Sequence, residues 1–372
     1  YHWVFYCDDG NLYFKTSTNG TSWSSEENVH SGGVNNGVYF SVFVNGTDVH
    51  YAVGPELAGL YYRKGTLNSN GTITWLTSEQ EVCSSSVHAP IISVDANNYP
   101  WIGYYTVESY VVKSSLTNGT WQNATGFPHC SEVEFYDVSP VPLSNGNVYV
   151  IYSYLSEVAK AVLYNGTWGT EANITDYPIE NCKSVTWTAK DNNIYFAYLR
   201  SAPHQIWYKR YTEGNWSSEE LVVDGVQSTS YPSISLGNAS IYVFWGNGSD
   251  IKFKRYTTFG SSETTLCTSI SNFVTVSLNA FYSSSDANLG LCWTNGSEDE
   301  HQVNYCWFKT YAPVYEPTET AIIIGIILSL SIITILVAII IYRRKHALPT
   351  RTGNLASNSH ASNNHDLKHS ED

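Results

Sequence analysis

The chain has 372 residues, 7 cysteines and a formal net charge of −14 at pH 7. Residues 1–320 hold 14 Lys and Arg against 30 Asp and Glu, a net charge of −16, whereas residues 321–372 hold 5 against 3, a net charge of +2. An acidic chain of this kind repels a phosphate backbone, so we expect no nucleic acid partner.

A phrase made of a Gly turn followed by Trp recurs along the chain. Five copies end at Trp23, Trp75, Trp121, Trp168 and Trp216, and Ser262 takes the Trp position in a sixth copy. Successive positions lie 52, 46, 47, 48 and 46 residues apart. A period in this range indicates a repeat architecture.

Each period contains alternating aromatic and β-branched stretches bounded by turn clusters, which predict strands. Residues 89–94, 139–143 and 231–236 predict innermost strands, and residues 99–105, 147–154, 193–199 and 240–245 predict second strands. No stretch of the first 312 residues has a 3.6-residue apolar period. Four strands per period predict an all-β fold, a β-propeller whose blades cover one another.

The two ends of the repeat region predict incomplete blades. Residues 2–7 form a second-type strand, and the last repeat offers first, second and third strands but no fourth. Seven blades are therefore preferred, with about two strands missing before Tyr1, and the absence of Met agrees with a lost N-terminal segment. Six blades are the alternative, in which residues 273–281 pair with the first hairpin.

Residues 321–341 are 21 residues without a charge, which at about 1.5 Å per residue cross a hydrocarbon layer of about 30 Å. The basic residues 343–345 follow directly, so the C-terminus is expected to be cytoplasmic. We therefore predict an extracellular propeller over residues 1–312, a stalk over 313–320, a single-pass type I transmembrane helix over 321–341 and a disordered cytoplasmic tail over 342–372. The expected location is the plasma membrane.

Two further features agree with an extracellular location. Eleven Asn-x-Ser/Thr sequons precede the apolar segment and none follows it, which predicts a glycoprotein; their asparagines are Asn19, Asn45, Asn70, Asn118, Asn123, Asn165, Asn173, Asn215, Asn238, Asn247 and Asn295. All seven cysteines lie on the same side, where disulfides are allowed, although their pairing is left open.

Metal binding is a minor alternative at two places. Cys83, Cys130, Cys182 and Cys267 recur shortly after fourth strands, and they are interpreted as buried or bridging residues rather than as a metal cluster with His88 and His129. The acidic segment 296–301 is interpreted as a solvated turn, with calcium as the alternative ligand. No other cofactor and no metal ligand is expected.

The Gly-turn-Trp phrase resembles the Asp-box, or BNR, repeat of sialidase-like propellers, Ser-x-Asp-x-Gly-x-Thr-Trp. Gly20, Ser22 and Trp23 match this pattern, and Thr18 stands where the Asp belongs. The resemblance implies a sialidase-like β-propeller over about 310 residues. It implies activity less directly, because such a box lies at the periphery of a blade and one fold serves many functions.

Sialidases of that family use three Arg to bind the substrate carboxylate, an Asp as the acid, and a Tyr-Glu pair as the nucleophile and its base. Residues 1–320 contain four Arg, of which Arg63, Arg210 and Arg255 recur at the ends of third strands and Arg200 follows a second strand. A structural role is preferred for the recurring three, so we expect a binding protein rather than an enzyme. A sialidase-like glycoside hydrolase or lyase is the alternative, with Glu134 and Asp137 as weak catalytic candidates.

The segments that lead from a fourth strand into the next first strand reach the axis of a propeller. They carry Tyr39, His88, Tyr136, Asp137, Trp187 and Tyr231. Aromatic faces and carboxylates suit sugars, so these residues are the candidate ligand-binding set. The leading hypothesis is a membrane-anchored cell-surface propeller that binds a glycan or a protein on its axial face, and the last alternative is a structural cell-envelope glycoprotein.

Overall fold

The computed structural model describes residues 1–34, 39–55, 58–121, 124–131, 137–181, 184–237, 240–256, 263–271, 278–280, 283–284, 288–297 and 300–309. The chain divides into two compact units, Tyr1–Pro313 and Val314–Asp372, and every described residue belongs to the first. These residues contain no helix of the length and apolarity that a membrane crossing requires. The predicted stalk, transmembrane helix and tail lie outside them and stay predictions.

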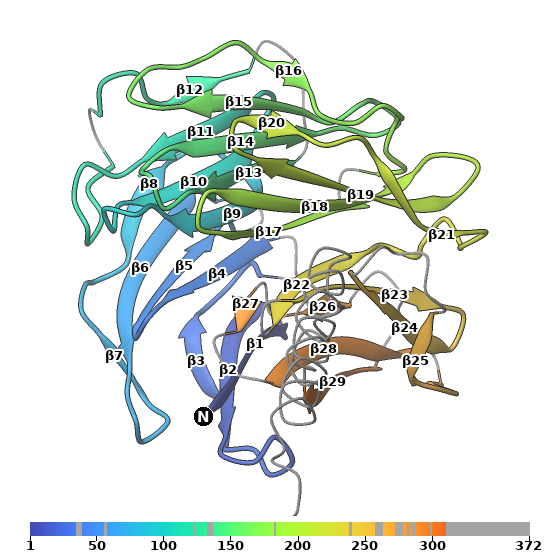
Figure 1. Ribbon diagram of the computed structural model, residues 1–372. Helices are drawn as coiled ribbons and strands as arrows, with labels where there is room; N and C mark the ends of the chain where they lie inside the picture. The colour runs from blue at the N-terminus through green and yellow to red at the C-terminus, as the bar shows by residue number, and fades with distance from the viewer. Residues whose placement is uncertain are drawn as a thin grey trace, which may run out of the picture. The chain divides into compact units, whose positions relative to one another are not determined.

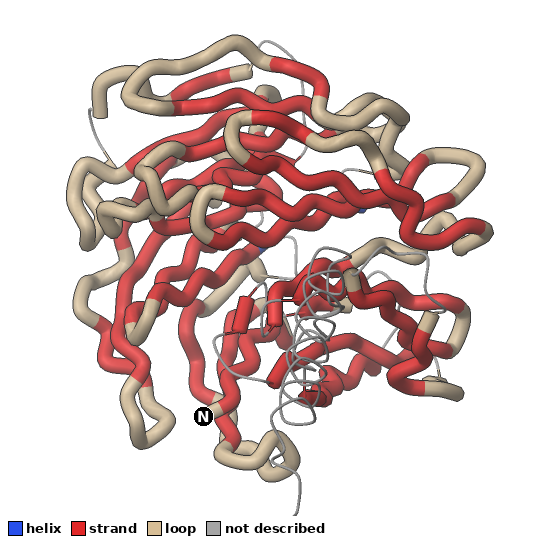
Figure 2. Tube along the Cα trace, in the orientation of Figure 1, coloured by secondary structure: helices blue, strands red, loops and turns tan. Residues whose placement is uncertain are grey.

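The strands fall into successive sheets, of which the first four are blades 1 to 4 (Figures 1 and 2). Blade 1 contains β1 (His2–Asp8), β2 (Asn11–Ser17) and β3 (Glu27–His30). Blade 2 contains β4 (Phe40–Asn45), β5 (Asp48–Val53), β6 (Leu60–Leu67), β7 (Ile73–Trp75) and β8 (Gln80–Cys83). Blade 3 contains β9 (His88–Val94), β10 (Pro100–Tyr105), β11 (Ser109–Lys113) and β12 (His129–Cys130). Blade 4 contains β13 (Asp137–Pro142), β14 (Val148–Ser153), β15 (Lys160–Tyr164) and β16 (Ala172–Asn173).

Two more blades and a last sheet follow. Blade 5 contains β17 (Val185–Lys190), β18 (Asn193–Arg200), β19 (Gln205–Thr212), β20 (Asn215–Trp216) and β21 (Glu220–Asp224). Blade 6 contains β22 (Ser233–Gly237), β23 (Ser240–Asn247), β24 (Asp250–Arg255) and β25 (Thr264–Cys267), and β27 (Ser283–Ser284) pairs with β22 in parallel. The C-terminal sheet contains β26 (Asn279–Ala280), β28 (Asn288–Ser297) and β29 (Glu300–Lys309).

The first three strands of each of blades 2 to 6 are antiparallel neighbours in chain order, as the repeat predicts, whereas β8 and β21 pair with β6 and β19 rather than with the strands just before them. The predicted second strands at 99–105, 147–154, 193–199 and 240–245 correspond to β10, β14, β18 and β23. These strands lie between turns and carry large apolar side chains on both faces. Both faces of each blade therefore pack against the neighbouring blades. The described residues form an all-β propeller of six blades, which confirms the predicted fold class.

The C-terminal sheet contacts both blade 6 and blade 1. His2 Nδ1 of blade 1 lies 2.6 Å from Tyr305 Oη, and the ring of Trp23 meets that of Tyr305 edge-on with centroids 5.2 Å apart. This sheet has three strands among the described residues, so the prediction of seven blades is not confirmed and stays a prediction. Asn279 and Ala280 pair with β28, whereas the six-blade alternative expected residues 273–281 to pair with the first hairpin.

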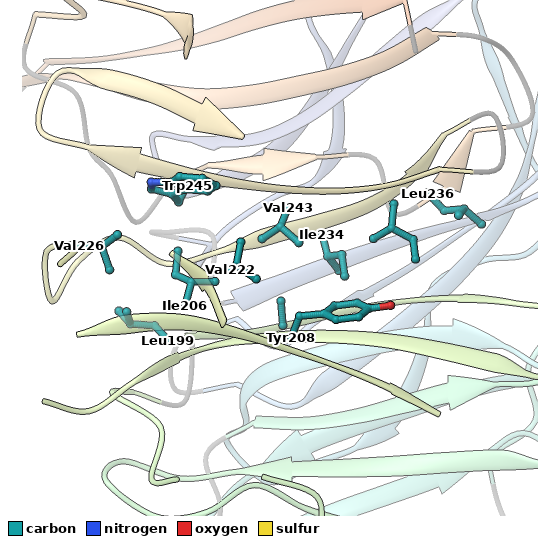
Figure 3. Close-up of a cluster of buried hydrophobic side chains, with 11 residues drawn as sticks. Leu199, Ile206, Tyr208, Val222, Val226, Ile234, Leu236, Val243 and Trp245 are labelled. Atoms are coloured by element: carbon teal, nitrogen blue, oxygen red, sulfur yellow. The ribbon is translucent and has the colours of Figure 1, made fainter. Parts of the chain in front are cut away.

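Hydrophobic clusters fill the space between adjacent sheets. Between blades 5 and 6, Leu199 and Ile206 face Val243 and Trp245 (Figure 3), and all four side chains are fully buried. Burial of one such side chain stabilises the fold by about 1.5–3 kcal/mol. Each blade therefore depends on its neighbours for stability.

The repeated Trp packs against the preceding blade. Trp121 of blade 3 meets Tyr62 of blade 2 edge-on, with ring centroids 5.0 Å apart. Trp216 of blade 5 lies 6.2 Å from Tyr149 of blade 4 in the same geometry. Trp168 of blade 4 likewise lies 6.5 Å from Trp101 of blade 3, so in blades 3 to 5 the repeated Trp supplies an aromatic contact with the blade before it.

The turn at residues 16–23 is closed by a different side chain from the one that the Asp-box pattern implies. Asn19 Oδ1 accepts hydrogen bonds from the backbone N–H groups of Thr21 and Ser22, both at 2.9 Å. The backbone N–H of Gly20, with φ of +75°, donates to Ser17 Oγ at 2.8 Å. The acceptor is therefore Asn19, one residue after the Thr18 position of the resemblance.

We expect His50 to make the fold acid-sensitive. Its side chain, 1% exposed on β5, has Nδ1 2.9 Å from Tyr62 Oη. Burial, together with the charge of Lys64, lowers the pKa of His50 from 6.5 to about 4. Between pH 6.5 and about pH 4, His50 binds a proton in the unfolded chain but not in the folded chain, so the free energy of unfolding falls as the pH drops. The expected loss is about 3 kcal/mol by pH 4, measured by urea unfolding over a pH series.

The variant His50→Gln removes the buried titrating group, so it should flatten this part of the stability profile. His88→Gln is the matched control, because His88 is exposed and its loss should leave the profile unchanged. Equal acid sensitivity in the parent and in His50→Gln would show that another group is responsible.

Candidate functional site

A cavity of about 280 Å³ opens where the innermost strands of blades 2 to 5 end. These strands are β4, β9, β13 and β17, which come from four successive blades (Figure 1). We name this the axial cavity; its lining residues are Phe43, Asn45, Val94, Asp95, Ala96, Asn98, Pro142, Leu143, Ser144, Trp187 and Ala189.

The axial cavity has an apolar interior and a polar rim. Phe43, Val94 and Leu143 are buried, and Trp187 of β17 is half-buried beside them. The rim carries the exposed side chains of Asn45, Asn98 and Ser144, so amide and hydroxyl groups surround the apolar surface. In the rim, Asn45 Nδ2 of blade 2 donates to Asn98 Oδ1 of blade 3 at 2.8 Å.

Asp95 holds the cavity wall in shape and is not a free acid. Its Oδ1 accepts from the backbone N–H groups of Asn97 and Tyr99 at 2.9 and 3.0 Å, which closes the turn between β9 and β10. Its Oδ2 accepts from Trp101 Nε1 at 2.8 Å, and Lys113 Nζ lies 3.6 Å away. Because the backbone and Trp101 occupy both oxygens, this carboxylate positions the rim that includes Asn98.

The predicted ligand-binding residues do not converge on one point. Trp187 lines the axial cavity, and its contact with a ligand stays a prediction. Tyr39 and His88 lie at or just before the starts of β4 and β9, whereas the cavity lies at the ends of these strands. Their rings are 5.8 Å apart, and Tyr39 is 9% exposed, so this pair belongs to the opposite end of the innermost strands.

The four remaining predicted residues lie apart from the cavity or outside the described chain. Tyr231 is half-buried against the cluster between blades 5 and 6. Asp137 is the first residue of β13 and is 9% exposed. Glu134 and Tyr136 lie outside the described residues, so the carboxylate pair of Glu134 and Asp137 stays a prediction.

The described arginines do not form a carboxylate clamp at the axial cavity, since none of them is among its lining residues. Arg63 Nε donates to the Thr77 carbonyl at 2.8 Å, and its guanidinium lies 4.9 Å from the centroid of the Trp75 ring. Arg200 stacks 3.8 Å from the centroid of the Tyr177 ring. These contacts support the structural interpretation of the arginines.

A Tyr-Glu pair does exist, but both of its residues belong to blade 2, and it contacts His30 of blade 1. Tyr51 Oη donates to Glu79 Oε1 at 2.6 Å, and His30 Nδ1 lies 2.7 Å from the same oxygen. Burial alone would raise the pKa of Glu79, but the hydrogen bonds from His30 and Tyr51 outweigh it and lower that pKa. Because Tyr51 is fully buried, the cluster of Tyr51, Glu79 and His30 stabilises the contact between blades 1 and 2 and does not contact a substrate.

The sequons favour one face of the propeller. Asn123 and Asn238 lie outside the described residues, Asn247 and Asn295 are half-buried, and the remaining seven asparagines are exposed. Six of the exposed ones follow a first or a third strand: Asn19, Asn45, Asn70, Asn118, Asn165 and Asn215. Because neighbouring strands are antiparallel, these turns lie on the face where the axial cavity opens.

The described cysteines and acidic residues form no bridge or metal centre. Cys7, Cys83, Cys130, Cys267, Cys292 and Cys306 are free thiols, so the expected disulfides are not seen among them. No group of three or more His, Cys, Asp or Glu side chains in the described part is placed to hold a metal ion. Cys182 and part of the acidic segment 296–301 lie outside that part.

Comparison with known proteins supports the fold. No known family and no curated protein matches the sequence. The solved polysaccharide lyase Uly1 matches with a TM-score of 0.51 and 8% identity, over 83% of this chain and 88% of the lyase. AofleA from Arthrobotrys oligospora matches with a TM-score of 0.50 and 10% identity, over 73% of this chain and 89% of its own. The sialidase of Trypanosoma rangeli matches with a TM-score of 0.47 and 12% identity, over 68% of this chain and 51% of the sialidase.

The likenesses to Uly1 and AofleA agree with the fold class, a β-propeller, and show no activity. The cavity residues that sequence reasoning missed are Asn45, Asn98 and Ser144 on the rim and Phe43, Val94 and Leu143 inside. For Asn98, Leu143 and Ser144 the signal was present as turn clusters after the innermost strands, in residues 95–98 and 143–147. We interpreted these clusters only as strand boundaries, whereas in the fold they face one cavity.

Proposed function

We propose that this chain is a membrane-anchored, N-glycosylated cell-surface β-propeller that binds a saccharide in its axial cavity. The observation that carries the proposal is the combination of Trp187, an apolar interior and a rim of neutral hydrogen-bonding groups in one concave site. A sugar ring has an apolar C–H face and peripheral hydroxyl groups, so an aromatic wall and amide groups match it. The volume of about 280 Å³ suits one or two sugar units.

The remaining parts of this proposal rest on the sequence. The uncharged segment 321–341 with the basic residues after it supports a type I anchor in the plasma membrane. The exposed sequons support glycosylation of residues 1–312. The C-terminal sheet, packed between blades 6 and 1, supports a seven-blade ring of which this sheet is the last blade.

A binding role is preferred to catalysis at this cavity. Asp95, the carboxylate among its described lining residues, is engaged by three N–H groups. General acid and base work on a glycosidic bond takes two carboxyl groups that can exchange protons. The cavity as described therefore offers recognition groups rather than a catalytic pair.

Replacing Trp187 with alanine should weaken saccharide binding by about tenfold or more. An aromatic stacking partner contributes about 0.5–1.5 kcal/mol beyond buried area, and tenfold in affinity corresponds to about 1.4 kcal/mol. The measurement is a glycan microarray with the purified full-length chain in mild detergent, followed by titration of the best ligand. Trp187→Phe keeps a flat ring and should retain most of the affinity.

Trp207→Ala is the matched control, because Trp207 is a half-buried Trp of the same blade that does not line the cavity. Its binding should equal that of the parent chain. The proposal fails if no saccharide is retained on the array, or if Trp187→Ala and Trp207→Ala bind equally well.

A further inference from the structure

Asn45 is the one sequon asparagine, of the nine that the structure describes, that lines the axial cavity. The sequon is Asn45-Gly46-Thr47, and all three residues are exposed in the turn between β4 and β5. Gly46 has a φ of +63°, and no atom lies within 4 Å of the position that a Cβ would take there. The turn is therefore open to a modifying enzyme at the mouth of the cavity.

The atom that glycosylation modifies already lies on the cavity rim. Asn45 Nδ2 is 2.8 Å from Asn98 Oδ1 of the next blade, so the amide group spans the edge of the opening. In the transfer, Nδ2 forms a bond to the anomeric carbon of an oligosaccharide carried on a polyprenyl pyrophosphate. The bond from that carbon to the pyrophosphate oxygen breaks, and one amide proton leaves. The second N–H of Asn45 remains to donate to Asn98, so the rim contact survives.

A sugar attached at this point competes for the cavity with any free ligand. Tethering gives it an effective concentration of about millimolar at a site within its reach. Trp187 and the apolar interior lie in the same cavity and suit the C–H faces of the attached sugars as well as those of a foreign saccharide. If the effective concentration of the attached sugar is ten times its dissociation constant for the cavity, the apparent affinity for a free ligand falls by about tenfold.

We propose that an N-glycan on Asn45 occupies the axial cavity and limits the binding of external saccharides. The inference rests on the proposed saccharide-binding function and adds its regulation. Chains that lack a glycan at Asn45 are the open form, and chains that carry one are the self-occupied form. The proportion of Asn45 that is glycosylated then sets the binding capacity of the cell surface.

The test compares two identical Asn-Gly-Thr sequons on one face of the propeller. Thr47→Ala removes the Asn45 sequon and keeps the Asn45 side chain, whereas Thr167→Ala removes the sequon of Asn165, an exposed asparagine in the outer turn of blade 4. Full-length chains from glycosylating cells are analysed by glycopeptide mass spectrometry and on a glycan microarray. We expect a glycan on Asn45 in the parent, about tenfold stronger array binding by Thr47→Ala, and unchanged binding by Thr167→Ala.

A second readout does not need an external ligand. Peptide N-glycosidase acting on the native chain should release the Asn45 glycan more slowly than the Asn165 glycan, and Trp187→Ala should remove this difference. The inference is overturned if Asn45 is unmodified, or if the parent and Thr47→Ala bind the array equally. The proposed function still stands in either case if array binding depends on Trp187. If all chains are silent on the array and both glycans are released at one rate, the inference and the proposed function fail together.

Discussion

Trp101→Ala is expected to lower the free energy of unfolding by about 3–5 kcal/mol. Trp101 is 1% exposed on β10, and its ring packs edge-on against Phe127 and Tyr164 with centroids 5.1 and 5.3 Å away. Alanine would leave a cavity at the interface of blades 3 and 4. It would also remove the Nε1–H donor of Asp95, a carboxylate that is 2% exposed, and so leave a buried charged oxygen short of a partner. Guanidinium unfolding followed by circular dichroism measures the loss.

Trp101→Phe separates the two effects, because it refills most of the space but supplies no N–H group. We expect it to cost about 1–3 kcal/mol, because Asp95 Oδ2 loses its hydrogen bond and keeps only the ion pair with Lys113 at 3.6 Å. Leu116→Ala is the surface control, since Leu116 is 52% exposed, and should change stability by less than about 0.5 kcal/mol. A cost below about 1 kcal/mol for Trp101→Ala would mean that this interface is looser than its contacts indicate.

One added methyl group on the same strand should be nearly as disruptive. A Cβ on Gly103 would lie 1.9 Å from the backbone carbonyl oxygen of Val138 in the next blade. The added Cβ is fixed to the backbone of β10, and the carbonyl belongs to the backbone of β13. Neither group can rotate away, so blades 3 and 4 must separate. Overpacking costs about 1–3 kcal/mol and occasionally more, so we expect Gly103→Ala to cost at least about 3 kcal/mol and to lower the Tm.

Gly169→Ala is the control for the chemical change itself. Its added Cβ would lie 3.2 Å from the Leu163 carbonyl oxygen, a contact that a shift of a few tenths of an ångström relieves. We expect its Tm to fall by much less than that of Gly103→Ala. If thermal melts of the two variants coincide, the close approach of blades 3 and 4 is not a determinant of stability.

The strands and the Trp turns could be predicted from the sequence because they depend on local patterns. The alternation in β10 and β18 and the Gly20 turn before Trp23 are readable within a few residues. The contact of Trp23 with Tyr305 could not be predicted in this way, because it joins residues from opposite ends of the repeat region. The apolar segment 321–341 remains a sequence prediction.

The candidate site was predictable only in part. Trp187 was predicted because it belongs to a segment that leads into an innermost strand, and the fold places it within β17 beside the axial cavity. Tyr39 and His88 lie at the other ends of their strands from the axial cavity, because periodicity does not show which end of a strand borders an open space, and their role as ligand contacts stays a prediction. Asp95 illustrates a further limit: its sequence context shows a turn, but only the fold shows that its carboxylate is engaged by backbone N–H groups and by Trp101.

Asn45, Asn98 and Ser144 keep the same charge between about pH 7 and pH 5, because amides and hydroxyls do not titrate there. A saccharide held by these groups alone would keep its hydrogen-bonding partners as the pH falls through that range. Its release would then depend on dilution or on a competing sugar rather than on protonation of the rim.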